Sequence, residues 1–141
     1  LVGSEMCIRD RPYNPKAIVF FCGTNDLTAL KTPEETVHDF KKFLSLVRNE
    51  FGNIKVYVIG IKPTLDRLYL DKEERIFNSL VSSLASDDAY LEYINIWDPM
   101  LNQDGSRMPE LFIEDGLHMN EKGYEVWTKK VRESLGKEFD L

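Results

Sequence analysis

One stretch of the sequence decides the fold class: Ala17-Ile18-Val19-Phe20-Phe21-Cys22-Gly23-Thr24-Asn25-Asp26. It begins with a continuous apolar run that ends at a glycine, which is typical of a strand buried on both faces of a sheet. Polar residues 23–26 follow at the carboxyl end of that strand. Parallel α/β sheets bind their ligands beyond this end. The stretch therefore predicts a parallel strand with a candidate site beside it.

Strand and helix patterns alternate along the rest of the chain. Thr32-Pro33-Glu34-Glu35 combines a capping box with proline at the first helical position, so a helix is expected from there to Gly52. Further strands are expected at residues 55–61 and 91–97, and further helices at residues 72–85 and from the capping residue Asn120 to Leu135. This order predicts one α/β domain, a three-layer α/β/α sandwich around a parallel sheet.

Each expected helix has one apolar face that should pack against the sheet. The spacings of three and four residues assign the inward side chains to Val37, Phe40, Leu44, Val47 and Phe51 on the first helix, Ile76, Leu80 and Leu84 on the second, and Tyr124, Trp127, Val131 and Leu135 on the last. Trp97 and Phe112 are expected to be core aromatics, with Phe112 near enough to the site to line a substrate pocket.

Composition narrows the functions that the chain can have. The 141 residues suffice for one domain, and the formal net charge is −6. Proteins that bind nucleic acid carry basic patches, so no nucleic-acid partner is expected. The longest apolar run, residues 17–22, is too short to cross a bilayer. Cys7 and Cys22 show neither a disulfide framework nor the spacing of a metal site.

A second polar cluster, Asp115-Gly116-Leu117-His118-Met119-Asn120, lies just before the last expected helix. A histidine held by a carboxylate is the general-base half of a nucleophilic site, because the carboxylate fixes the ring tautomer and stabilises the imidazolium. Asp115 and His118 are close enough in sequence to meet across a turn. The other histidine, His38, is expected on the solvated side of the first helix, beside Asp39.

Each cluster alone also has a purely structural interpretation. Asp115 and His118 can belong to a turn before a helix capped by Asn120, and residues 23–26 can be a strand-to-helix turn in which glycine supplies an unusual φ. A metallophosphoesterase is a further alternative, prompted by the Gly-x-x-Asp turn. Two-metal sites need several histidine and aspartate ligands, however, and the chain has only 2 histidines.

Together and in this order, the two clusters resemble those of the GDSL/SGNH hydrolases, which carry Gly-x-Asn-Asp after a strand and Asp-x-x-His before the C-terminal helix. The resemblance runs from Pro12 to about Leu135 and includes Tyr13-Asn14-Pro15-Lys16, Ile61-Lys62-Pro63, Gly123-Tyr124 and Trp127. It implies a flavodoxin-like sandwich that hydrolyses small-molecule carboxylic esters without a metal or organic cofactor.

The resemblance also implies a role for each matching residue. His118 would act as general base and then as general acid, and Asp115 would orient its ring. Asn25 would donate its side-chain amide to the oxyanion. Removing one such donor typically lowers the rate by about 10²–10³-fold. Gly23 supports the motif, and Asp26 would organise the turn rather than perform chemistry.

The nucleophile segment of the family, Gly-Asp-Ser on an earlier strand, has no match here, and neither has the glycine donor that should follow it. Residues 1–11 resemble instead the translation of a transposon-based sequencing-library adapter. We therefore expect residues 12–141 to be an N-terminally truncated hydrolase domain whose serine lies upstream. Neither Ser106, which no strand delivers, nor Cys22, a strand residue, is expected to be the nucleophile.

Three functions are compatible with this resemblance. The leading hypothesis is the C-terminal part of a Ser–His–Asp esterase or lipase that is inactive as it stands. Acyl transfer to another acceptor is its nearest chemical variant. The third is a non-catalytic domain that binds an ester or a carbohydrate, although binding alone does not need a tautomer-fixing pair. Without the nucleophile strand, residues 18–21 should form an unpaired, aggregation-prone sheet edge and leave the chain marginally stable.

Overall fold

A three-stranded parallel sheet forms the centre of the computed structural model, which describes residues 14–140. Its strands are β1 (Ala17–Phe21), β2 (Lys55–Ile59) and β3 (Leu91–Ile94), and they lie in the order β1-β2-β3. In the register, Ala17 pairs with Lys55, and Val56 pairs with Leu91. The predicted adapter-like segment, residues 1–11, lies outside the described residues.

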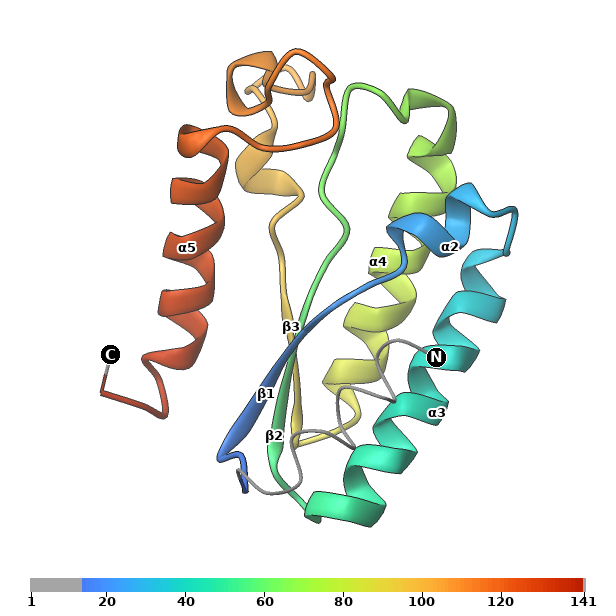
Figure 1. The fold of residues 1–141 in the computed structure, drawn as a ribbon, viewed down its shortest axis with the longest axis vertical. Helices are drawn as coiled ribbons and strands as arrows, with labels where there is room; N and C mark the ends of the chain where they lie inside the picture. The colour runs from blue at the N-terminus through green and yellow to red at the C-terminus, as the bar shows by residue number, and fades with distance from the viewer. Residues whose placement is uncertain (1–13, 141) are drawn as a thin grey trace.

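Helices cover both faces of this sheet (Figure 1). α3 (Pro33–Phe51) and α4 (Asp71–Ser86) lie on one face, and α5 (Glu121–Leu135) lies on the other. The five-residue α2 (Thr24–Thr28) follows β1, and 3₁₀ turns occupy Leu68–Leu70, Asp98–Met100 and Pro109–Leu111. The arrangement confirms the predicted three-layer α/β/α sandwich with a parallel sheet. No helix within residues 14–140 has the length and apolar character needed to span a membrane.

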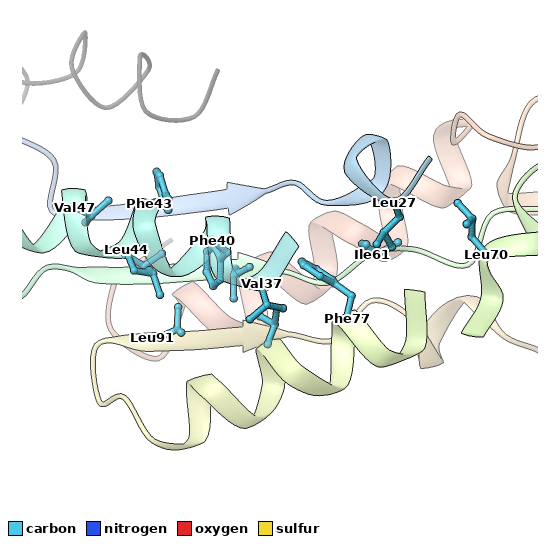
Figure 2. Close-up of a cluster of buried hydrophobic side chains, with 13 residues drawn as sticks. Leu27, Val37, Phe40, Phe43, Leu44, Val47, Ile61, Leu70, Phe77 and Leu91 are labelled. Carbon is cyan, nitrogen blue, oxygen red and sulfur yellow. The ribbon is translucent and has the colours of Figure 1, made fainter. Parts of the chain in front are cut away.

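Two apolar clusters hold the three layers together. The larger one lies between the sheet and the pair α3 and α4, and Figure 2 shows side chains from all of these elements in it. Leu27 of α2 reaches into the same cluster beside Ile61, so α2 is anchored in the core. The smaller cluster, around Tyr57 and Ile94, packs against Trp127 of α5. Burial of apolar surface on both faces therefore fixes the sheet between its helices.

The predicted starts of α3 and α5 are confirmed by their capping hydrogen bonds. Thr32 Oγ1 accepts from the backbone N–H of Glu35 at 3.2 Å, and Glu35 Oε2 accepts from the N–H of Thr32 at 2.9 Å, which completes the capping box of α3. Asn120 Oδ1 accepts from the N–H of Gly123 at 3.2 Å at the start of α5. Gly52 follows the end of α3, as predicted, with a positive φ of 65°.

Two strands end earlier than predicted because side chains take over their backbone hydrogen bonds. After Ile59, the amide of Asn78 binds the backbone N–H and C=O of Ile61 at 2.8 and 2.9 Å, in place of a neighbouring strand. After Ile94, Asn95 Oδ1 accepts from the N–H of Trp97 at 2.9 Å and turns the chain. β2 therefore ends at Ile59 rather than at residue 61, and β3 ends at Ile94 rather than at residue 97.

Four further expectations were wrong in detail. Residues 24–28 form a short helix, not only a turn. The fully buried residues of α4 are Glu74, Phe77, Asn78 and Val81, and Asn78 faces inward because it bonds the backbone of Ile61. Leu80 and Leu84 are partly buried against the same cluster, as predicted, whereas Ile76 is not part of it. Tyr124 is 57% exposed and stacks on Trp127 from outside. β1 is not buried on both faces: Val19 is 45% exposed.

Candidate active site

The two predicted polar clusters lie at the same end of the sheet. α2, which begins with Thr24 and Asn25, directly follows β1, and the turn that contains Asp115 and His118 precedes α5. Figure 1 shows both segments beyond the carboxyl ends of the strands. The loop from β2 to α4 lies between them and bonds to each, as described below. The topology therefore gathers the candidate residues where ligands of parallel sheets bind.

Asp115 holds the imidazole of His118 through one carboxylate oxygen and the local backbone through the other. Asp115 Oδ2 lies 2.6 Å from His118 Nδ1. Asp115 Oδ1 accepts from the backbone N–H groups of Leu117 and His118, both at 2.8 Å. The hydrogen bonds from His118, followed by the one from Leu117, lower the pKa of Asp115 to about 2. The carboxylate is thus ionised at neutral pH and presents an acceptor to Nδ1.

This contact leaves the other ring nitrogen of His118 for chemistry. Because Nδ1 is engaged by a carboxylate, the neutral ring carries its proton there and presents the Nε2 lone pair. The side chain of His118 is 68% exposed, so Nε2 is accessible to a reacting group. A histidine in this state can remove a proton from a hydroxyl and return it to a leaving group.

The turn that carries the pair is fixed on several sides. Phe112 and Met119 form an isolated antiparallel bridge, and the N–H of Ile113 donates to His118 O at 2.9 Å. The side chain of Asn120 donates to Phe112 O at 3.0 Å, so the residue that caps α5 also holds the turn. Phe112 is buried among apolar residues, which confirms it as a core aromatic. The Asp115–His118 geometry is therefore preorganised by its own loop.

Asn25 is exposed as the second residue of α2. Gly23 precedes the helix with a φ of 104°, a conformation that side chains other than hydrogen rarely adopt. Leu27, two residues after Asn25, is buried in the core and so holds α2 in place. Asp26 bonds the turn that follows α2, where its backbone carbonyl accepts from the N–H of Lys31 at 3.1 Å. Its carboxylate accepts from Lys31 Nζ at 3.0 Å, and the same Nζ donates to Asp39 Oδ2 of α3 at 2.9 Å, so Lys31 joins α2 to α3.

The β2–α4 loop supplies a residue that sequence reasoning missed. Arg67 is buried, and its Nη1 donates to Thr24 O at 3.1 Å. Both Nη atoms also lie 3.4 Å from Asn25 Oδ1. Lys62, in the same loop, is buried with its Nζ over the ring of Phe21, and burial, with Arg67 nearby, lowers its pKa. The sequence feature that could have identified Arg67 is its position: it is a cationic residue in a loop that follows the carboxyl end of a strand.

The residues set aside as nucleophiles occupy unsuitable places. Burial, reinforced by the charge of Asp26, raises the pKa of the Cys22 thiol to about 12, so the thiol stays protonated. Ser106 lies in an exposed turn and donates to Asp104 Oδ1 at 2.6 Å. His38 is exposed on α3, as predicted. Within residues 14–140, no three His, Cys, Asp or Glu side chains are grouped to hold a metal.

Comparison with known proteins places this geometry in a family. Residues 5–126 match the family model described as GDSL-like Lipase/Acylhydrolase. An N-acylneuraminate cytidylyltransferase of Escherichia coli is 27% identical over 117 residues, which are 82% of this chain and 27% of that protein. The chain thus spans about a quarter of the length of this curated relative.

Solved structures share the fold. A GDSL-like lipase from Bacteroides thetaiotaomicron superposes with a TM-score of 0.74 at 18% identity, over 96% of this chain and 72% of that one. The esterase domain of a zebrafish retrotransposon ORF1 protein gives a TM-score of 0.66 at 26% identity, over 82% of this chain and 65% of that one. The parallel sheet, the site at its carboxyl end and the match over residues 5–126 lead to one conclusion: the chain belongs to the GDSL-like lipase/acylhydrolase family.

Proposed function

We propose that this chain is the acid–base half of a serine esterase, with His118 as general base, Asp115 as its orienting carboxylate and Asn25 as an oxyanion donor. The observation that carries the proposal is the 2.6 Å contact between Asp115 Oδ2 and His118 Nδ1, which commits the ring to one tautomer. Membership of an ester-hydrolase family supports the same assignment.

The nucleophile in this proposal is a serine on a strand upstream of β1. Its hydroxyl would pass its proton to His118 Nε2 as it attacks the ester carbonyl, and the resulting oxyanion would accept from the Asn25 amide. Collapse would expel the alcohol, which takes the proton back from His118. Water would then hydrolyse the acyl-enzyme by the same route. The substrate is a small-molecule ester with a small or medium acyl group, and no metal or organic cofactor takes part.

The test compares the full-length protein with the chain of 141 residues. We expect the full-length protein to hydrolyse p-nitrophenyl acetate and to be labelled by a fluorophosphonate, and the present chain to do neither. In the full-length protein, His118→Ala and Asp115→Asn should each lower kcat by at least about 10³-fold, since either change removes the oriented base.

Two matched controls accompany these variants. His38→Ala removes the other histidine, which is exposed on α3, and Asp104→Asn alters an exposed aspartate that also bonds its local backbone. Neither should change kcat by more than about twofold, because no hydrogen bond or ion pair among the described residues links either side chain to Asp115, His118 or Asn25. Fluorophosphonate labelling of the present chain would mean that it holds its own nucleophile, and a fully active His118→Ala variant would mean that His118 is not the base; either result would refute the proposal. A full-length protein that neither hydrolyses the ester nor reacts with the fluorophosphonate would favour a non-catalytic binding domain.

A further inference from the structure

The loop between β2 and α4 contacts both halves of the candidate site. The backbone N–H groups of Leu65 and Asp66 donate to Gly116 O at 2.8 and 3.1 Å, inside the turn of Asp115 and His118. The next residue, Arg67, bonds α2 instead, through Thr24 O and Asn25 Oδ1. This loop therefore sets where the base and the oxyanion donor lie relative to each other.

We propose that Arg67 is a positioning residue that fixes the side-chain amide of Asn25, so that Asn25 Nδ2 is the atom free to donate to the oxyanion. The proposal rests on the esterase function proposed above. It goes beyond that function because it assigns a role to a residue outside the Gly-x-Asn-Asp and Asp-x-x-His segments.

The chemistry of the two side chains leaves one orientation. A guanidinium has five N–H donors and no acceptor, whereas an amide presents a carbonyl oxygen on one side and an NH₂ group on the other. Because both Nη atoms of Arg67 lie 3.4 Å from the same amide atom of Asn25, that atom must be the acceptor Oδ1. If the amide were flipped, the NH₂ group of Asn25 would face the N–H donors of Arg67, and no hydrogen bond could form. The NH₂ group is consequently the end that points away from Arg67.

Arg67 is well held for this task. The residue is only 9% exposed, and the Nη1 bond to Thr24 O at 3.1 Å anchors the guanidinium to the backbone of α2 itself. The positive charge behind the Asn25 carbonyl also polarises the amide and makes Nδ2 a stronger donor. A preorganised donor of this kind stabilises charge that develops only in the transition state. Loss of Arg67 should therefore lower kcat more than it changes KM.

A double-mutant cycle in the full-length protein separates positioning from simple structural support. We expect Arg67→Gln to lower kcat about 10- to 100-fold while KM changes less than about twofold, and Arg67→Lys, which keeps the charge but loses the fork, to recover part of this. In an Asn25→Ala background, the same Arg67→Gln change should cost less than about threefold, because the group it positions is gone. An equal loss in both backgrounds would overturn the proposal.

Arg48 provides the matched control. It also bonds backbone carbonyl oxygens, those of Ile54 at 2.7 Å and Tyr90 at 3.1 Å, but it lies on α3 at the other end of the sheet. Arg48→Gln should lower the melting temperature and leave kcat within about twofold of the wild type. If Arg48→Gln lowered kcat as much as Arg67→Gln, the effect would be one of general stability and the proposal would fail.

A spectroscopic test does not depend on ester hydrolysis. In ¹⁵N-labelled protein, the Nδ2 signals of Asn25, identified by their loss in Asn25→Ala, should shift in Arg67→Gln and remain in Arg48→Gln where they are in the wild type. Unshifted signals in Arg67→Gln would overturn the proposed contact. A shift in a full-length protein that hydrolyses no ester would support the orientation of Asn25 by Arg67 and refute the proposed esterase function instead.

Discussion

Asp115 shows how one side chain can organise a turn and a base at once. Its two carboxylate oxygens accept three hydrogen bonds, two from backbone N–H groups of residues 117 and 118 and one from the ring of His118. The backbone bonds hold the carboxylate still, so the imidazole meets an acceptor of fixed direction. Truncation of this residue would therefore disturb the loop as well as the base, whereas Asp115→Asn keeps an acceptor for the backbone.

Gly23 allows the chain to pass from β1 into α2, and we predict that Gly23→Ala destabilises the protein. Its φ is 104°, and a Cβ would lie 3.0 Å from Phe77 Cζ and 3.2 Å from Ile61 Cδ1. Backbone strain and contact with core side chains should together lower the free energy of unfolding by about 2–4 kcal/mol. Urea denaturation followed by circular dichroism measures this change.

Gly52→Ala separates the two causes of that loss. Gly52 also has a positive φ, 65°, but nothing lies within 4 Å of where its Cβ would stand. We expect this variant to lose only the conformational part, about 1–3 kcal/mol, because a φ of 65° with a ψ of −141° is open essentially to glycine alone. Equal losses in the two variants would mean that the contact with Phe77 contributes nothing at Gly23.

Among the elements, β1 forms the sheet edge that was predicted for residues 18–21. Within residues 14–140 it has one neighbour, β2, so its other edge presents unpaired backbone groups. Val19 and Phe21 are 45% and 38% exposed on this edge strand. An apolar edge of this kind can pair with another chain, which is a common start of aggregation.

We predict that Val19→Lys reduces aggregation of the present chain. A lysine on an edge strand disfavours strand addition because a second chain would have to approach its charge. Light scattering at 37 °C should show slower growth for Val19→Lys than for the wild type. Leu68→Lys, an equally apolar-to-charged change at a residue that is 62% exposed away from the sheet edge, serves as control. If both variants slowed aggregation equally, the cause would be the change in net charge, and the role proposed for the β1 edge would be wrong.

At the scale of the whole molecule, a buried polar group joins α4 to the loop after β3. Glu74 is fully buried, and neither of its carboxylate oxygens has a hydrogen-bond partner among the described residues. Arg107 Nη2 lies 3.7 Å from Glu74 Oε2 but donates to Asp71 Oδ1 at 2.6 Å, and its other Nη donates to Thr64 O. Burial outweighs the nearby guanidinium and raises the pKa of Glu74 to about 7.

This shift makes the stability of the protein depend on pH. Because the pKa of Glu74 is higher in the folded than in the unfolded chain, the folded state binds its proton more tightly. The contribution of Glu74 to stability is therefore complete below about pH 4.5 and is lost as pH rises through about 7. We predict that the free energy of unfolding falls between pH 5 and 8, relative to Glu74→Gln, on the order of 1–3 kcal/mol.

Urea denaturation of the wild type and Glu74→Gln at pH 5, 6.5 and 8 tests this. Glu125→Gln, at an exposed position on α5, should follow the wild type in parallel at all three pH values. A constant difference between the wild type and Glu74→Gln across the range would show that Glu74 is ionised in the folded protein throughout, with Arg107 as an effective counter-charge.

The sequence by itself determined the features that depend on neighbouring residues. It predicted the three strands, the three long helices, the caps of α3 and α5, and the pairing of Asp115 with His118, because three-residue spacings and capping boxes act within a single turn. Membership of the hydrolase family follows from the same short segments and is confirmed by the family match. The serine upstream stays a prediction.

Only the tertiary structure decided the contacts between distant segments. Arg67 and Asn25 are 42 residues apart, and the inward face of α4 includes Asn78 because the backbone of Ile61, 17 residues away, needs hydrogen-bond partners. Glu74 and Arg107 meet only after α4 has docked on the sheet. Local spacing carries no information about such pairs, since their partners are chosen by how the layers pack and by which buried polar groups remain to be satisfied.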